Sequence, residues 1–417
     1  MKYLNHIKDK IFLREGHLIL LANLTDKVVN FIIMVVAARY MSLSTYGNFS
    51  YIKSIITTMT PFAGLGGNHA LLRFGMDTSD IKEKYNLLFS ALIFGSLFTI
   101  IFLFVLKFLF LYYDFFKNSE LEEIFNIYIF FILSYYIYDV VRNYYRINFD
   151  NRTYAMNSIR YALLTLVLGS LGLILFDYIF FLILIVVLPI VITLIDNRKI
   201  LFKTMFSIKF EKPFWKYGTL IGSGAFLNQF FMQSDILILG FLEIEPELIA
   251  QYKVATLLVY TFIFIPNAFL VRDFTTLSAH AKNKKFLVEY VYTYLKYSSV
   301  ILLCLIPLFY IFSNTVLIFL FGEKFQNSLQ VQNILVIGLI SIVLLRMLFG
   351  NILNAVGKAN LNVINAVFTI IIAIPILFFL TGEYGIIGTA YAMVIVFFCS
   401  GIISLVMFVY YIKNIRG

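Results

Sequence analysis

Apolar stretches long enough to cross a lipid bilayer recur along this chain about every 30 residues, each followed by a short polar loop. Hydrophobic residues make up 61% of the 417 residues and charged residues only 13%, which is unlike a soluble protein. The apolar runs are continuous and do not alternate, so they predict helices and not a membrane barrel. The chain is therefore predicted to be an all-α integral membrane protein with about 12 transmembrane helices.

The predicted spans are each long enough for a helix to cross the hydrocarbon. They are residues 17–38, 46–67, 85–111, 121–141, 154–175, 178–195, 214–240, 249–271, 293–312, 328–349, 360–380 and 384–411.

Most of the 33 lysines and arginines lie on one side of these spans, in the two terminal tails and in alternate loops. Arg142 and Arg346 are assigned to two of these basic loops, at 142–153 and 346–359, and a third is expected at 68–84. Because cytoplasmic loops carry the excess of Lys and Arg, both termini are predicted to be cytoplasmic. Anionic lipid headgroups account for the net charge of +10, and no nucleic-acid partner is expected.

An internal repeat divides the chain. A shift of about 204 residues places Arg142 on Arg346 and Pro61 near Pro266, and equal halves of this kind are typical of transporters. We expect two parallel six-helix lobes, residues 1–200 and 201–417, joined by a cytoplasmic linker at about 196–216.

Polar side chains within the predicted spans are costly in a bilayer and therefore mark candidate sites. The first span has four on one helical face, and the second, seventh and eighth spans carry further ones. They are Asn23, Asp26, Lys27 and Asn30, then Lys53, Thr57 and Thr60, then Asn228, Gln229 and Asp235, and finally Lys253.

Two interpretations of these residues stay open. They line a water-filled cavity, or they pair as contacts between helices, Asp235 with Lys253 and Asp26 with Lys27 or Lys53. Arg160 is expected either to snorkel to the cytoplasmic surface or to face the cavity.

Asp139 and Arg142, three residues apart at the end of the fourth span, predict an ion pair at the membrane interface.

Motifs for enzyme chemistry are not found. No two of the four histidines lie within four residues of each other, and both cysteines lie in apolar runs, so neither a metal site nor a cofactor is predicted. No nucleotide-binding motif occurs, so transport would be ion-coupled, driven by membrane potential, or passively gated. We expect a protein that is not an enzyme.

Four segments resemble polysaccharide flippases of the Wzx type, in the multidrug/oligosaccharidyl-lipid/polysaccharide exporter superfamily. One departure is Ala250-Gln251, where a glycine is usual. The segments are Ala38 to Gly47, Gly64 to Arg73, Asp235 to Gly240 with Ala250-Gln251-Tyr252, and Asn354 to Asn360.

The resemblance covers essentially the whole chain and implies two lobes that form a V-shaped central cavity. It implies alternating access in the bacterial inner membrane, moving an undecaprenyl-pyrophosphate-linked oligosaccharide repeat unit from the cytoplasmic to the periplasmic leaflet for O-antigen or capsule synthesis. Membrane lipids, a polysaccharide polymerase and a chain-length regulator are the further partners it suggests.

The related lipid II flippases carry basic residues on helices one, two and eight and an acid on helix one. By this analogy the first-ranked cavity residues are Asp26, Lys27, Lys53 and Lys253. Arg160, Asn23, Asn30 and Asn228 complete the expected substrate-binding set, and Asp26 and Asp235 are expected to bind a coupling ion or form charge pairs.

Three alternatives stay open: a drug or cation antiporter of the same superfamily, an exporter of another lipid-linked polymer, and a membrane glycan polymerase or ligase. The short outer loops count against the enzyme.

Overall fold

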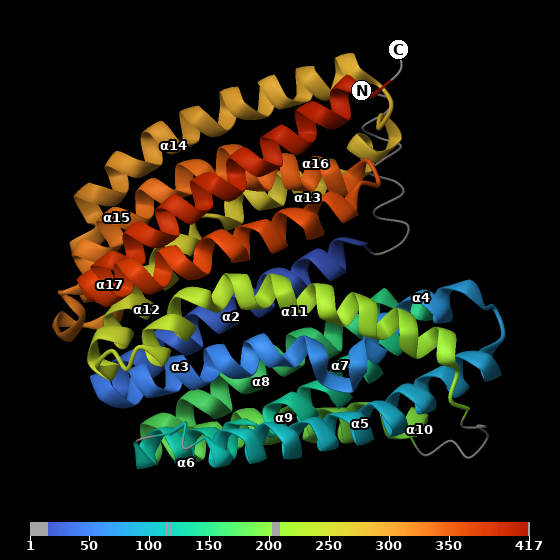
Figure 1. Ribbon diagram of the computed structural model, residues 1–417. Coiled ribbons are helices and arrows are strands. Elements are labelled where there is room, and N and C mark those ends of the chain that lie inside the picture. Colours follow the sequence, from blue (N-terminus) through green and yellow to red (C-terminus); the bar gives the residue numbers. More distant parts are fainter. Residues whose placement is uncertain (1–15, 114, 117, 202–208, 416–417) are drawn as a thin grey trace. The chain divides into compact units, whose positions relative to one another are not determined.

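The computed structural model describes residues 16–113, 115–116, 118–201 and 209–415, and every regular element in these ranges is a helix (Figure 1). The predicted basic N-terminal tail and residues 202–208 of the predicted linker lie outside the described residues. The all-α prediction is thus confirmed for the described part of the chain.

Eight helices in the described ranges are long and apolar enough to cross a membrane. The first five are α2 (Gly16–Tyr40), α5 (Ile81–Tyr112), α6 (Ser119–Tyr128) with α7 (Phe131–Ile147), α8 (Asn151–Leu175) and α9 (Tyr178–Asp196). The others are α14 (Lys284–Phe321), then α15 (Ser328–Ser341) continued by the π-helix η3 (Ile342–Met347) and α16 (Leu348–Ala355), and finally α17 (Ala359–Lys413).

Helix α17 contains two of the predicted spans. Its 55 residues would extend about 80 Å as a straight helix, far more than a bilayer requires. Gly385 interrupts it with φ 56° and ψ −138°, a conformation that only glycine adopts readily. The two halves then lie side by side, since Asn365 Nδ2 donates to Ser404 Oγ at 2.7 Å. The turn predicted after residue 380 is confirmed.

Three predicted spans are helical but are not among these eight. They correspond to α3 (Leu43–Met59), α11 (Lys212–Phe241), and α12 (Pro246–Thr261) with α13 (Phe264–Ala279). The helices α3, α12 and α13 have only 17, 16 and 16 residues, fewer than the roughly 20 of a typical span. Helix α11 is longer, but polar residues such as Asn228, Gln229 and Asp235 interrupt its apolar run. The number of twelve crossings stays a prediction.

The chain turns sharply after α3. In η1 (Thr60–Gly66) the residues Gly64, Leu65 and Gly66 all have positive φ, which ends the helix near Pro61. The chain then continues as α4 (Gly67–Asp77), a helix inside the loop predicted at 68–84. The expectation of a loop was therefore wrong for this part, because polar residues were taken as an end of helical structure.

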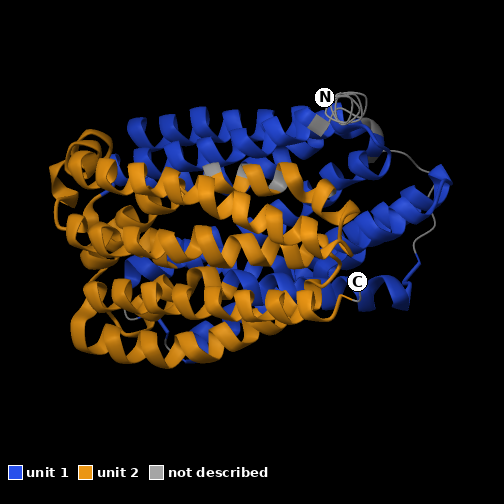
Figure 2. Ribbon diagram, turned by 90° about the horizontal axis from the view of Figure 1, so that it is seen from above, with its two compact units in different colours: residues 1–41, 52–229 blue, residues 42–51, 230–417 orange. Residues whose placement is uncertain are grey.

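The described chain divides into two compact units, coloured separately in Figure 2. Unit 1 comprises residues 1–41 and 52–229, and unit 2 comprises residues 42–51 and 230–417. In unit 1, α2 packs along α8, α8 packs against α9, and α9 packs against α7; in unit 2, α15 packs against α12 and α17. The predicted lobes 1–200 and 201–417 stay a prediction.

Side-chain caps fix the starts of several helices. An Asp or Asn carboxylate or amide oxygen accepts a backbone N–H of the first turn, which satisfies a donor that the helix leaves open. These caps are Asp80 for α5, Asn118 for α6, Asp150 for α8, Asp177 for α9 and Asn283 for α14. The remaining short elements are α10 (Arg198–Leu201) and η2 (Glu323–Phe325).

Candidate functional site

Unit 1 contains a cavity of about 600 Å³ among its helices. Carboxylates, amides, hydroxyls, an amine and an imidazole line it, together with four tyrosines. The polar lining residues are Asp26, Asn30, Lys53, Thr57, Thr60, Asn68, His69, Asp139, Thr165, Asn228 and Gln229, and the tyrosines are Tyr128, Tyr135, Tyr136 and Tyr161.

Four of the residues predicted to bind substrate or ion meet in this cavity. Asp26 and Asn30 come from α2, Lys53 from α3, and Asn228 from α11. The polar faces of the first, second and seventh predicted spans therefore contribute to one space, as the cavity interpretation required. Their roles in binding remain a prediction.

The other five predicted residues are not among those that line the cavity, namely Asn23, Lys27, Arg160, Asp235 and Lys253. The side chain of Arg160 is 51% exposed and its guanidinium lies 3.2 Å from the carboxylate of Asp196. Both positions expected for Arg160, at the cytoplasmic surface and in a central cavity, stay predictions.

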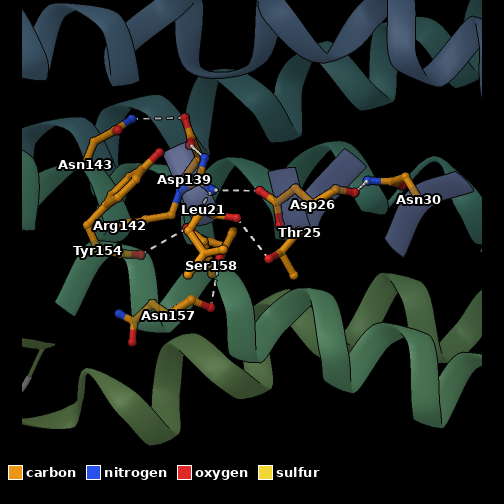
Figure 3. A network of polar contacts seen from close by, with 11 residues as sticks. Leu21, Thr25, Asp26, Asn30, Asp139, Arg142, Asn143, Tyr154, Asn157 and Ser158 are labelled. Carbon is orange, nitrogen blue, oxygen red and sulfur yellow. Dashed lines mark hydrogen bonds and ion pairs between the residues drawn. The ribbon is translucent and has the colours of Figure 1, made fainter. Parts of the chain in front are cut away.

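An arginine joins two aspartates beside the cavity (Figure 3). Arg142 on α7 donates to Asp139 Oδ1 at 2.7 Å, and another of its nitrogens lies 3.8 Å from Asp26 Oδ2 on α2. The predicted ion pair between Asp139 and Arg142 is confirmed. The contact to Asp26 connects it to the first span, where sequence reasoning had considered only lysines as partners.

Burial makes this network stronger than a surface pair. The Arg142 side chain is 11% exposed and the Asp139 side chain 14% exposed, so water screens their attraction weakly. Arg142 also donates to Ser158 Oγ on α8 at 3.1 Å and lies over the rings of Tyr138 and Tyr154. The network therefore ties α2, α7 and α8 together.

The expectation that Arg142 and Arg346 lie in loops was wrong. Arg142 lies inside α7, which continues to Ile147, and Arg346 lies inside the π-helix η3, which α16 continues to Ala355. Hydropathy alone ends a span at the first strong charge, whereas the fold continues the helix because neighbouring helices supply partners for that charge.

Asp139 is also held by two amides. Asn68 Nδ2 donates to its Oδ2 at 2.8 Å and Asn143 Nδ2 donates to the same oxygen at 3.1 Å. Next to Asn68, burial lowers the pKa of His69 below its ordinary 6.5, and the charge of Asp139 opposes this shift. Burial therefore favours the neutral imidazole of His69.

Tyr136 shapes the cavity wall through glycines that leave room for its ring. A Cβ on Gly64 would lie 2.1 Å from a Tyr136 ring atom, and one on Gly95 would lie 1.8 Å from its hydroxyl. The Tyr136 hydroxyl donates to the carbonyl of Ala91 at 2.8 Å. The turn after α3 and the helix α5 are thereby fitted to this side chain.

Sequence reasoning missed several lining residues, among them Asn68, Tyr135, Tyr136 and Asp139 as cavity groups. A helical stripe on α7 carries part of the missing signal, since Phe131, Tyr135 and Asp139 follow one another at four-residue spacing. Asn68 lies in a segment expected to be a loop, so no periodicity could have placed it.

In unit 2 the predicted residue Asp235 lies on α11 and the predicted residue Lys253 lies on α12. The Tyr252 hydroxyl donates to Asp235 Oδ2 at 3.0 Å, and the backbone N–H of Ile236 donates to its Oδ1. Asp235 is 2% exposed. No ion pair within 4.0 Å joins Asp235 and Lys253 among the described residues, and both interpretations of these residues stay predictions.

Among the described residues no group of three or more His, Cys, Asp or Glu side chains is arranged to hold a metal ion.

A family model described as "Polysaccharide biosynthesis protein" matches residues 12–272, which is more than half of the chain. A comparison with curated proteins finds no significant sequence match.

Solved structures of transporters share this fold. An inward-facing multidrug resistance MATE family transporter of the MOP superfamily matches with a TM-score of 0.73 at 15% identity, covering 95% of this chain and 94% of that one. The lipid II flippase MurJ, in an inward closed conformation, matches with a TM-score of 0.73 at 15% identity, covering 94% and 87%. An outward-facing MATE transporter matches with a TM-score of 0.66 at 15% identity, covering 98% and 96%. The fold is thus that of multi-pass membrane transporters of this superfamily.

Proposed function

Because this chain belongs to the polysaccharide biosynthesis protein family, we propose that it is a flippase for lipid-linked oligosaccharides. It moves undecaprenyl-pyrophosphate-linked repeat units from the cytoplasmic to the periplasmic leaflet of the bacterial inner membrane, for the synthesis of O-antigen or capsule. The family supports a role in polysaccharide synthesis, and the fold shared with MurJ supports a lipid-linked cargo.

The observation that carries this proposal is the polar cavity of unit 1. Groups that are costly at membrane depth gather there instead of scattering, which points to a polar cargo. Its amides and carboxylates, such as Asn30, Asn228 and Asp26, are the usual partners of sugar hydroxyls, and Lys53 supplies a cation for a phosphate.

The cavity volume limits what it holds. At about 600 Å³ it falls within the range of small-molecule pockets, roughly 300–1,000 Å³. A complete repeat unit with its carrier is larger, so the cavity accepts part of the polar headgroup while the polyprenyl tail stays in the lipid. Transport then proceeds by alternating access, with the two predicted lobes opening toward one leaflet at a time.

The second candidate is an ion-coupled drug or cation antiporter, because two carboxylates, Asp26 and Asp139, line the cavity and such groups bind cations. In that case the MATE structures would be the better guide to function.

Deletion of the gene separates the two. We expect the undecaprenyl-linked unit to accumulate in the cytoplasmic leaflet, measured by leaflet-resolved labelling of the lipid-linked glycan, and the wild-type gene to restore surface glycan. Normal surface glycan together with hypersensitivity to cationic drugs would refute the flippase and support the antiporter.

A further inference from the structure

The two arginines that the internal repeat superposes have opposite electrostatic surroundings. Arg142 in unit 1 is matched by Asp139 at 2.7 Å and Asp26 at 3.8 Å. Arg346 in unit 2 has no carboxylate within 4.0 Å among the described residues. Where the first guanidinium has an acid, the second lies over the ring of Phe231, 4.0 Å from its centroid.

The repeat itself explains this difference. The shift that carries Arg142 to Arg346 carries Asp139 to Val343 and Asp26 to the region of Phe230 and Phe231. Both acids are therefore replaced by apolar residues. The closest acidic residue along α11, Asp235, is already engaged by the hydroxyl of Tyr252.

The rest of the surroundings of Arg346 is polar but uncharged. Its guanidinium donates to Ser400 Oγ at 3.0 Å. Ser400 belongs to a buried chain of hydrogen bonds in which Thr369 Oγ1 donates to Asn365 Oδ1 at 3.0 Å and Asn365 Nδ2 donates to Ser404 Oγ at 2.7 Å. Hydroxyls and amides of this kind solvate an ion pair, yet only the cation is present.

Arg346 also has N–H groups beyond the one that bonds Ser400. The residue is only partly buried, and its hydrogen bond to Ser400 uses one of the two terminal nitrogens. Arginine presents several N–H groups in a planar fork that matches two oxygens of a phosphate. Arg346 itself lies in the π-helix Ile342–Met347, a type of distortion often found at functional sites.

The depth of Arg346 suits an anion that enters from the cytoplasm. It lies nine residues before the end of α16 at Ala355, about 14 Å along a helix, and the charge pattern predicts that this end faces the cytoplasm. A cation without a counter-charge inside the membrane is costly. An anionic ligand would give Arg346 the counter-charge that Asp139 and Asp26 give Arg142 in unit 1.

We propose that Arg346, with Ser400 beside it, is a phosphate-binding site that takes the pyrophosphate of the lipid carrier. This rests on the proposed flippase function and names a residue of unit 2 as the one that binds the anion. The site binds by two charge-assisted hydrogen bonds from the guanidinium, and Phe231 keeps its other face dry.

Two variants test the site in the purified full-length protein, with inorganic pyrophosphate and undecaprenyl pyrophosphate as probes. Arg346→Gln removes the cation, and Phe231→Asp supplies the acid that unit 1 has and so competes with the ligand. Both are expected to weaken binding of both probes at least about tenfold, which corresponds to one charge-assisted hydrogen bond. Arg73→Gln, at an exposed ion pair, is the control and should bind as the wild type does. Equal binding by Arg346→Gln and the wild type would overturn the proposal.

The melting temperature of Arg346→Gln shows whether a loss of binding is caused by misfolding. Without ligand, Arg346→Gln should melt at the same or a higher temperature than the wild type, because an uncompensated charge is removed. A clear fall in Tm would show that Arg346 is a structural residue and would also refute the site.

The source of the phosphate is tested in nanodiscs. Displacement of bound inorganic pyrophosphate by undecaprenyl pyrophosphate, at levels where phosphatidylglycerol displaces none, supports the lipid carrier as the ligand. Displacement by phosphatidylglycerol and not by undecaprenyl pyrophosphate would identify a bilayer headgroup as the ligand and overturn the assignment. These outcomes are separate from the leaflet assay, which tests the flippase function and not the identity of this site.

Discussion

The guanidinium of Arg142 lies between the carboxylates of Asp139, at 2.7 Å, and Asp26, at 3.8 Å. Asp26 belongs to the first helix of the described chain and lines the polar cavity, whereas Arg142 lies behind it on α7. The ion network therefore fixes the position of Asp26 in the cavity wall. A change in the charge of Asp26 or Arg142 is expected to change the stability of unit 1.

Arg142→Met is expected to destabilise the protein strongly. It leaves the buried carboxylate of Asp139 without its cation, and breaking a buried pair in this way typically costs about 3–5 kcal/mol. Thermal unfolding of the purified protein in detergent measures the effect. Arg73→Met is the matched control, since its pair with Asp77 is more than half exposed and such pairs contribute about 1 kcal/mol at most. Similar melting temperatures for the two variants would contradict a buried network.

Lys53→Ala and Lys253→Ala should lose function while the protein still inserts in the membrane. Lys53 lines the cavity and Lys253 is the predicted basic residue of unit 2, and loss of a charge-assisted contact lowers transport about tenfold or more. Lys107→Ala should be nearly silent, because Lys107 is expected to snorkel from near a helix end. Complementation of surface glycan in the deletion strain reports activity, with immunoblots of membranes to compare expression. The idea of a cationic cavity is untenable when all three variants complement equally.

Gly64→Ala should destabilise unit 1 by about 2 kcal/mol or more, because it combines overpacking with a left-handed backbone. Gly64 has φ 56°, and an added Cβ would lie 2.1 Å from a ring atom of Tyr136. Gly224→Ala is the control, since a Cβ there meets nothing within 4 Å and alanine favours the helix. Detergent-solubilised yield and Tm are the measurements, and a Gly64→Ala protein as stable as Gly224→Ala would show that Tyr136 is not packed in this way.

Cysteine labelling tests the orientation predicted from the charges. In a background without Cys304 and Cys399, Lys282→Cys should be protected from a membrane-impermeant maleimide in intact spheroplasts, whereas Glu245→Cys should react. Permeabilised cells are the control, because both cysteines should then react. The reverse pattern in intact spheroplasts would invert the predicted topology.

Much of the fold could be predicted because each membrane helix corresponds to one continuous apolar run in the sequence. The turn within α17 is an example: Gly385 and the polar residues around it interrupt an apolar run, and the structure folds the chain back there. The ends of α7 and α16 were misjudged because Arg142 and Arg346 look like loop residues until the groups around them are known.

The candidate site was predicted in part. The polar stripe of α2 and the lysine of α3 were visible as polar groups in apolar helices, and Asp26, Asn30 and Lys53 do line one cavity. Asn68 was not visible, because its role depends on the turn that brings α4 beside Asp139. A hydrogen bond between residues 71 positions apart leaves no periodic trace in the sequence.

The sequence by itself determined that this protein is a bundle of membrane helices, because the cost of exposing backbone polar groups to lipid acts on every apolar run separately. Only the tertiary structure decided how charges inside the membrane are matched. Arg142 and Arg346 are equivalent in the repeat, but the first has two acids around it and the second has the ring of Phe231. Such matching depends on how neighbouring helices rotate and pack, and it decides whether a buried cation stabilises the fold or remains available to a ligand.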